Sequence, residues 1–107
     1  MHCGEHDPPP KIAGRWKMKQ FNGDELSGML IMEQSGPRLE GRLEWQDHAD
    51  GKVIGTVIQR TVAITVYYPN GSVAQYAGEL SRDGKCLIHG LVTSSTRVYA
   101  SWSADLL

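Results

Sequence analysis

The chain has 107 residues, a length typical of one folded domain. Its 11 basic and 12 acidic residues give a formal charge of -1, which is no electrostatic reason to expect nucleic acid or an anionic membrane as a partner. Only Cys3 and Cys86 are present, which argues against a disulfide framework. No segment has the pattern of a signal peptide or the length of a membrane span, so we expect a cytoplasmic protein.

Residues 1–10 form a polar, proline-rich segment. Its three consecutive prolines favour extended polyproline geometry over a helix or a central strand. We therefore expect a flexible arm over residues 1–10 and one folded domain over residues 11–107. The arm carries four side chains that can ligate a metal, but their spacing matches no closed zinc site, and no metal site is expected. These side chains are His2, Cys3, His6 and Asp7.

From about Ile12 to the end of the chain, short runs of alternating and β-branched residues recur, and no helical periodicity is sustained. The chain is therefore predicted to be all-β with little or no helix. The expected strands cover residues 13–21, 28–35, 38–46, 52–58, 61–68, 72–81, 85–94 and 98–106. Every connection is too short to cross over a sheet, so neighbours in sequence are expected to pair as antiparallel hairpins.

The third expected strand defines an inward and an outward face, because charged side chains alternate there with apolar ones or glycine. The residues expected to face water are Arg38, Glu40, Arg42 and Glu44. The residues expected to face the interior are Leu39, Gly41, Leu43 and Trp45. Two-residue turns at Gly36-Pro37 and Gln59-Arg60 extend this register to the neighbouring strands. The resulting pairs are Met32 with Gly41, Leu30 with Leu43, Val57 with Val62, Gly55 with Ile64 and Val53 with Val66.

Two further connections have the residues of a three-residue loop, in which the last residue takes the left-handed conformation that glycine favours. They are Pro69-Asn70-Gly71 and Arg82-Asp83-Gly84. The first loop predicts the pairs Val66 with Ala74, Ile64 with Tyr76 and Val62 with Gly78. The second predicts the pairs Leu80 with Cys86, Gly78 with Ile88 and Tyr76 with Gly90. Each inward glycine then faces a large residue across the strand gap, as in sharply coiled sheets.

Eight consecutive hairpins would leave two exposed sheet edges unless the first strand met the last. We therefore predict a single up-and-down antiparallel β-barrel of about eight strands. An open sheet or a two-layer sandwich is the alternative.

The glycines and aromatic residues follow an order that resembles the small bacterial β-barrels of the avidin-like and lipocalin-like kind, over residues 12–106. The matching stretches are Gly14-x-Trp16, Gly28-x-Leu30-x-Met32-x-Gln34-x-Gly36, Leu39-x-Gly41, Gly55-Thr56-Val57, Tyr76-x-Gly78, Ile88-x-Gly90 and Trp102. The resemblance implies a small ligand at the open end of the barrel. Leu43 stands where avidin-like proteins usually carry an aromatic residue, and no ureido-binding polar set is recognisable, so biotin binding is not implied.

Four aromatic residues have inward parity and could line a pocket for a small apolar or aromatic ligand. They are Trp16, Trp45, Tyr76 and Trp102, and the expected polar contacts at the barrel mouth are Gln20 and Gln34. The alternative is that the same aromatic residues simply fill the barrel, since an eight-stranded barrel is just wide enough to be filled by its own side chains.

No side-chain pattern predicts catalysis, and we expect neither an enzyme nor a cofactor. The segment Gln46-Asp47-His48-Ala49-Asp50 places a histidine among carboxylates but is equally typical of a solvated loop. Ser94-Ser95-Thr96 is a polar turn without recognisable triad partners. His89 has outward parity, and Cys86 has inward parity and is expected to be a small buried hydrophobe.

A protein-interaction module is the second functional hypothesis. Outward apolar residues on the second, fourth and fifth expected strands could form an interface between two copies of the chain. These are Met29, Ile31, Ile54, Ile58 and Tyr67, together with Ala63. The N-terminal arm is the other candidate surface, because some secreted protease inhibitors are similar small barrels that insert an N-terminal segment into an enzyme cleft.

Overall fold

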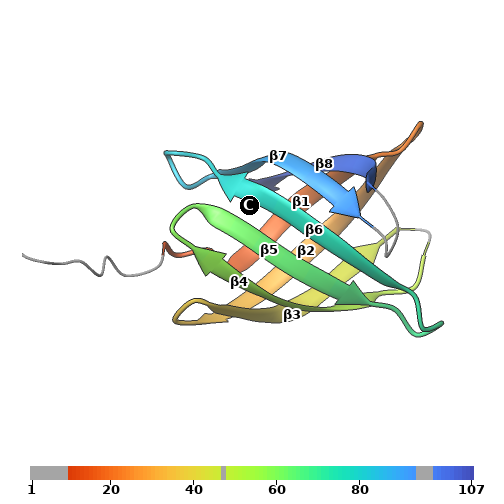
Figure 1. The fold of residues 1–107 in the computed structure, drawn as a ribbon, viewed down its shortest axis with the longest axis horizontal. Coiled ribbons are helices and arrows are strands. Elements are labelled where there is room, and N and C mark those ends of the chain that lie inside the picture. Colours follow the sequence, from red (N-terminus) through yellow and green to blue (C-terminus); the bar gives the residue numbers. More distant parts are fainter. Residues whose placement is uncertain (1–9, 47, 94–97) are drawn as a thin grey trace, which may run out of the picture.

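The computed structural model describes residues 10–46, 48–93 and 98–107, and these form a closed β-barrel of eight antiparallel strands in sequence order (Figure 1). The predicted fold class is therefore confirmed. The strands are β1 Gly14–Phe21, β2 Glu25–Ser35, β3 Arg38–Trp45, β4 Gly51–Ile58, β5 Thr61–Tyr67, β6 Val73–Leu80, β7 Cys86–Thr93 and β8 Val98–Leu106. Within the described ranges, no helix has the length and hydropathy that crossing a membrane would require.

Pairing of β1 with β8 closes the barrel, with Met18 opposite Ala104 and Gln20 opposite Trp102. Closure gives every strand two neighbours, so no row of backbone hydrogen-bonding groups is left open to another chain. The two-layer sandwich is thereby excluded.

Inward side chains fill the middle of the barrel, and charged side chains of β3 face outward as expected. Leu39 and Leu43 of β3 have no exposed surface, whereas Arg38, Glu40 and Arg42 are exposed. The largest fully buried side chains are Trp16, Tyr76, Ile12, Met18, Leu30, Leu39, Leu43 and Leu87. This filling leaves the two ends of the barrel as the places where its interior can be reached.

The turn residues determine most of the register. The pairs predicted for β2 with β3, for β4 with β5 and for β5 with β6 are all present. The Pro69-Asn70-Gly71 loop is closed by hydrogen bonds from Tyr68 N to Ser72 O (3.0 Å) and from Gly71 N to Tyr68 O (3.0 Å). Gly71 has a φ of 89°, the left-handed conformation expected at this position.

The register predicted for β6 with β7 is wrong, because the connection holds four residues rather than three. Ser81 N donates to Cys86 O at 2.8 Å, so residues 82–85 form the loop and Leu80 lies opposite Leu87. A slip of one residue exchanges the two faces of a strand. Leu87 is therefore buried in the core, and Cys86 is not.

Cys86 consequently differs from the buried hydrophobe that the sequence predicted. It is half-buried, and its Sγ lies 3.4 Å from Asp105 Oδ1 on β8. The hydrogen bond to the Asp105 carboxylate raises the pKa of the thiol. The thiolate is disfavoured in this position, so Cys86 is a weak nucleophile.

A β-bulge in β7 then restores the expected parity. Between Leu87 and Gly90 one extra residue is inserted relative to both neighbouring strands, and His89 at its centre has a φ of 54° and is exposed. The Trp102 ring covers the inner side of the irregularity. Its Nε1 donates to the carbonyl oxygens of Ala77 and Leu91, both at 3.2 Å.

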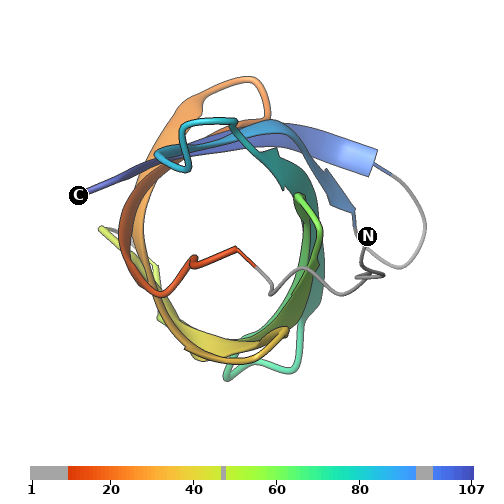
Figure 2. The same cartoon turned by 90° about the vertical axis from the view of Figure 1, so that its left-hand side faces the viewer.

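One end of the barrel is closed by residues 10–13, which precede β1 and extend from the barrel wall over the opening in Figure 2. Ile12 is only 1% exposed, and its backbone nitrogen donates to Gln34 Oε1 at 2.7 Å. Gln34 Nε2 donates to the carbonyl oxygens of Pro10 and Gly36, both at 2.9 Å. Trp16 Nε1 donates to the carbonyl oxygen of Ile12 at 3.0 Å. We call residues 10–13 the N-terminal plug; the rest of the expected arm, residues 1–9, lies outside the described residues.

Candidate functional site

The other end of the barrel, which we call the mouth, contains a cavity of about 460 Å³. It lies where β1, β3 and β5 end, at the right-hand side of Figure 1. The residues that line it are Gln20, Asn22, Leu26, Trp45, His48, Ala49, Tyr68, Pro69, Asn70, Ser72, Tyr76 and Tyr99. Four of these side chains are aromatic, and among the described lining residues none is Lys, Arg, Asp or Glu.

Two aromatic side chains form one wall of the cavity. Trp45 Nε1 donates a hydrogen bond of 2.9 Å to the Tyr68 hydroxyl, and both rings pack against the core while remaining partly exposed. Glycines make room for them. A Cβ on Gly28 would lie 3.0 Å from Trp45 Cε3, and a Cβ on Gly51 would lie 3.0 Å from Tyr68 Cε1. The paired rings therefore pack directly on the two glycines, and a side chain at either position would have to displace its neighbours.

The floor of the cavity is a buried polar pair. The Tyr76 hydroxyl donates to Gln20 Oε1 at 2.7 Å, and Gln20 is only 5% exposed. The Tyr76 ring packs edge to face on Trp102, with ring centroids 5.7 Å apart and planes at 74°. Burial, and then the neighbouring Tyr68, raises the pKa of Tyr76 far above its ordinary value, so its hydroxyl stays protonated at any physiological pH.

The rim is organised by a polar loop. Asn70 Oδ1 accepts hydrogen bonds from Ser72 N at 2.9 Å and from Ser72 Oγ at 2.7 Å, the bonding expected of an asparagine turn. His48 and Ala49 of the connection between β3 and β4 also line the cavity and are exposed.

The structure brings together only part of the site predicted from the sequence. Gln20, Trp45 and Tyr76 line the mouth. Trp102 lies beneath Tyr76 and does not line the cavity, while Trp16 and Gln34 lie at the opposite end, where they hold the N-terminal plug. The prediction that Gln34 is a polar contact at the mouth is therefore wrong, and Trp16 belongs to the core.

Most of the mouth was not predicted from the sequence. Tyr68 and Tyr99 are the chief omissions, and for Tyr68 a signal was present. Tyr68 continues the inward series of β5 by one step before Pro69, which marks the end of the strand at the mouth. Tyr99 follows a connection whose residues 94–97 lie outside the described part of the chain, and no sequence pattern distinguished it.

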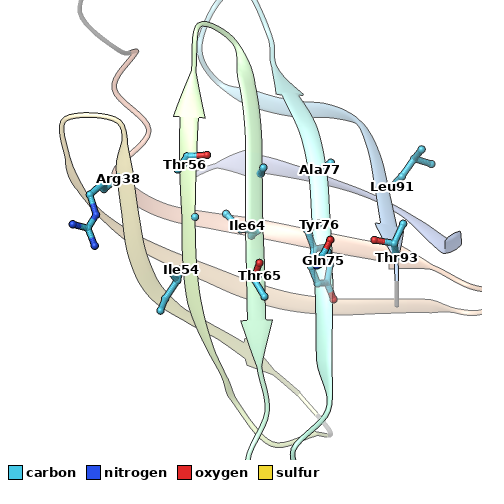
Figure 3. A pocket seen from close by; sticks show the side chains of 12 residues that line it. Arg38, Ile54, Thr56, Ile64, Thr65, Gln75, Tyr76, Ala77, Leu91 and Thr93 are labelled. Atoms are coloured by element: carbon cyan, nitrogen blue, oxygen red, sulfur yellow. The ribbon is translucent and has the colours of Figure 1, made fainter. Parts of the chain in front are cut away.

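A second hollow lies on the outer wall, across β4, β5, β6 and β7 (Figure 3), with a volume of about 530 Å³. We call it the wall groove. The hollow forms because the small residues Ala63 and Ala77 are adjacent there, and the larger Ile54 and Leu91 stand on either side. No buried polar group faces it among the residues described, because Thr65, Gln75 and Thr93 are at least partly exposed to water. The wall groove is therefore a surface depression, whereas the mouth opens into the core.

The predicted interface stripe is divided in two. Ile54, Ile58 and Tyr67 are exposed on β4 and β5, whereas Met29 and Ile31 are half-buried on β2. Between these two groups lies β3, whose outward side chains are all charged and include the ion pair of Arg42 Nε with Glu44 Oε2 at 2.7 Å. The apolar surface on β4 and β5 continues instead to Val73 and Leu91 on β6 and β7.

The structure adds little support for the other candidate catalytic and metal-binding residues. His48 and Asp50 are exposed, Asp47 lies outside the described residues, and so do Ser94-Ser95-Thr96 and the four metal-capable side chains of the arm. Within the described ranges no group of three His, Cys, Asp or Glu residues is placed to hold a metal ion. His89 is exposed on the bulge, as its predicted outward parity required.

Comparison with known protein families, curated proteins and solved structures gave no match to this chain. The mouth must therefore be interpreted from its own residues.

Proposed function

We propose that this barrel is a binding protein for a small, uncharged aromatic molecule, which it holds at the mouth without chemical change. The observation that carries the proposal is the contrast between the two ends of the barrel. The middle is filled and the N-terminal plug closes one end, whereas the other end keeps a cavity of about 460 Å³ with four aromatic side chains in its lining. A cavity of this size suits one small molecule.

The composition of the lining supports an uncharged aromatic occupant. The Trp45 and Tyr68 rings provide apolar area, and aromatic rings pair favourably with other aromatic rings in stacked or edge-to-face geometry. The described lining residues include no Lys, Arg, Asp or Glu, so none of them offers a charged ligand the ion pair that would offset its lost hydration. The resemblance to avidin-like and lipocalin-like barrels points to the same end of the fold.

Binding without catalysis is the simpler use of these side chains. The most buried titratable group at the mouth, the Tyr76 hydroxyl, has a strongly raised pKa and already donates its proton to Gln20. It is therefore a poor general base. The aromatic and amide groups around it can orient a ligand, and the Ser72 hydroxyl at the rim donates to Asn70 Oδ1.

A thermal-shift screen of small aromatic molecules tests the proposal. A ligand present at a hundred times its dissociation constant is expected to add roughly 2.7 kcal/mol to the free energy of unfolding. Its binding should quench tryptophan fluorescence, since Trp45 lines the cavity. Trp45→Leu is expected to weaken binding about tenfold, the effect of losing about 1.4 kcal/mol of ring contact.

Leu91→Ser is the control, because it removes an apolar side chain from the wall groove and leaves the mouth intact. It should leave the affinity unchanged. A ligand whose affinity is unchanged by Trp45→Leu but lost with Leu91→Ser would contradict the proposal.

A second candidate function, association of two copies through the outer wall, is favoured by one observation. Exposed apolar side chains gather on β4 to β7 around the wall groove, and Ile58 is 65% exposed. Contiguous apolar surface on a small domain often marks an interface. The exposed members of this group are Ile54, Ile58, Tyr67, Val73 and Leu91.

Analytical ultracentrifugation tests this second candidate. The protein is expected to sediment as a dimer at high micromolar concentration, and Ile58→Lys should shift it to the monomer by placing a charge in the apolar surface. Thr61→Lys places the same charge on the adjacent exposed position of β5 and tests whether the effect is specific to apolar contact. A wild-type protein that remains monomeric throughout the concentration range would rule out this association.

A further inference from the structure

Gln20, at the floor of the mouth, has hydrogen-bonding capacity that the described part of the protein does not use. Gln20 Oε1 accepts the Tyr76 hydroxyl at 2.7 Å, but within the described part of the chain no residue accepts a hydrogen bond from Gln20 Nε2. An amide nitrogen without a protein acceptor depends on water or on a ligand for its hydrogen bonds.

This nitrogen is not sealed inside the core. Among the described residues, every side-chain nitrogen or oxygen that is sealed from solvent has a hydrogen-bond partner. Gln20 Nε2, which has none, must therefore keep some access to solvent, although the residue as a whole is only 5% exposed. Gln20 lines the mouth cavity, so its N–H groups can be reached from that side.

The orientation of the amide is fixed by its neighbour. A phenol has one proton to give, and the contact of the Tyr76 hydroxyl with Gln20 Oε1 has hydrogen-bond geometry. Burial raises the pKa of this hydroxyl, so it keeps its proton, and in the structure it donates this proton to Gln20 Oε1. The amide oxygen is thereby held toward Tyr76 and the amide nitrogen is turned away from it.

We propose that the ligand of the mouth is an aromatic molecule with a hydrogen-bond acceptor, such as a ring nitrogen or a carbonyl oxygen, at the end that enters first, and that Gln20 Nε2 donates to this acceptor. The inference rests on the proposed function and deepens it, since it specifies the polarity and direction of the ligand. Trp45 and Tyr68 contact the ring nearer the rim, and Gln20 binds the inner end.

Quinoline and naphthalene are suitable probes, because the two molecules have nearly the same shape and only quinoline carries an acceptor nitrogen. Quinoline is expected to bind roughly three- to tenfold more tightly, the effect of one neutral hydrogen bond. Gln20→Leu should reverse this preference, because burying the ring nitrogen without a donor is unfavourable. Gln75→Leu, the same change on the exposed outer wall, should leave the preference intact.

Nuclear magnetic resonance of the wild-type protein provides a test that does not depend on the folding of Gln20→Leu. In protein labelled with ¹⁵N, quinoline should shift the side-chain amide signals of Gln20, and naphthalene should shift them much less. Equal affinities for the two probes, with no selective shift of the Gln20 amide, would overturn this inference and leave the proposed function standing. Failure of both probes to bind at the mouth would overturn both.

Discussion

Replacement of Gly41 by alanine is expected to destabilise the barrel by about 3 kcal/mol, the upper part of the range for overpacked positions. A Cβ on Gly41 would overlap the carbonyl oxygen of Ile31 on the neighbouring strand β2. That carbonyl belongs to the backbone ladder of a closed barrel and cannot swing away as a side chain could. Urea unfolding followed by circular dichroism measures the loss.

Gly78→Ala is the matched comparison for Gly41→Ala. The atoms nearest to a Cβ on Gly78 are Trp102 Cζ2 at 3.0 Å and the carbonyl oxygen of Ile88 at 3.2 Å. A shift of a few tenths of an ångström by the ring would relieve the closer contact, so a loss of about 1 kcal/mol is expected. A Gly41→Ala variant as stable as the wild type would show that β2 does not approach β3 this closely at Gly41.

Removal of the Ile12 side chain is expected to cost about 2 to 4 kcal/mol, although this residue lies outside all eight strands. Ile12 is 1% exposed and closes the end of the barrel, and its backbone is bound on both sides, by Gln34 and by Trp16. Ile12→Ala would therefore open a void where the plug meets the core. The free energy of unfolding in urea is again the measurement.

Lys11→Ala serves as the control, since Lys11 is the exposed neighbour of Ile12 in the same segment. It should change stability by no more than about 0.5 kcal/mol, as exposed substitutions usually do. Equal and small effects of the two substitutions would show that the segment does not close the barrel in solution.

The barrel could be predicted from the sequence because its turns carry strong conformational signals. Pro69-Asn70-Gly71 specifies both the loop length and the left-handed glycine, and it correctly placed Ile64 opposite Tyr76. Arg82-Asp83-Gly84 has a similar pattern, but the register that it predicted for β6 with β7 is wrong. There the Ser81 side chain enlarges the turn, since Ser81 Oγ contacts Asp83 Oδ1 at 2.6 Å and accepts from Cys86 N at 3.0 Å.

The bulge at His89 could not be predicted, because a left-handed histidine has no sequence marker comparable with glycine. It is stabilised by tertiary contact: the Trp102 indole donates to the carbonyl oxygens of Ala77 and Leu91 beside the irregularity. Such a contact joins residues far apart in the sequence. The slip at the loop and the extra residue in the bulge change the parity twice, so Gly90 still faces inward as predicted.

The site was only partly predicted, because parity identifies a face of a strand but not an end of the barrel. Gln20 and Gln34 both have inward parity near the end of a strand. In an up-and-down barrel, however, consecutive strands run in opposite directions, so the end of β1 lies at the mouth and the end of β2 at the plug. Strand direction and parity together therefore assign the two glutamines to opposite ends of the barrel.

An experimental structure of the protein with a bound aromatic acceptor, such as quinoline, tests the central claim most directly. The molecule is expected to occupy the mouth, in contact with Trp45 and Tyr68, with its acceptor atom within hydrogen-bonding distance of Gln20 Nε2. The plug and the filled middle of the barrel are expected to stay unchanged. Density for the molecule in the wall groove, or a mouth closed by the protein's own side chains, would contradict the claim.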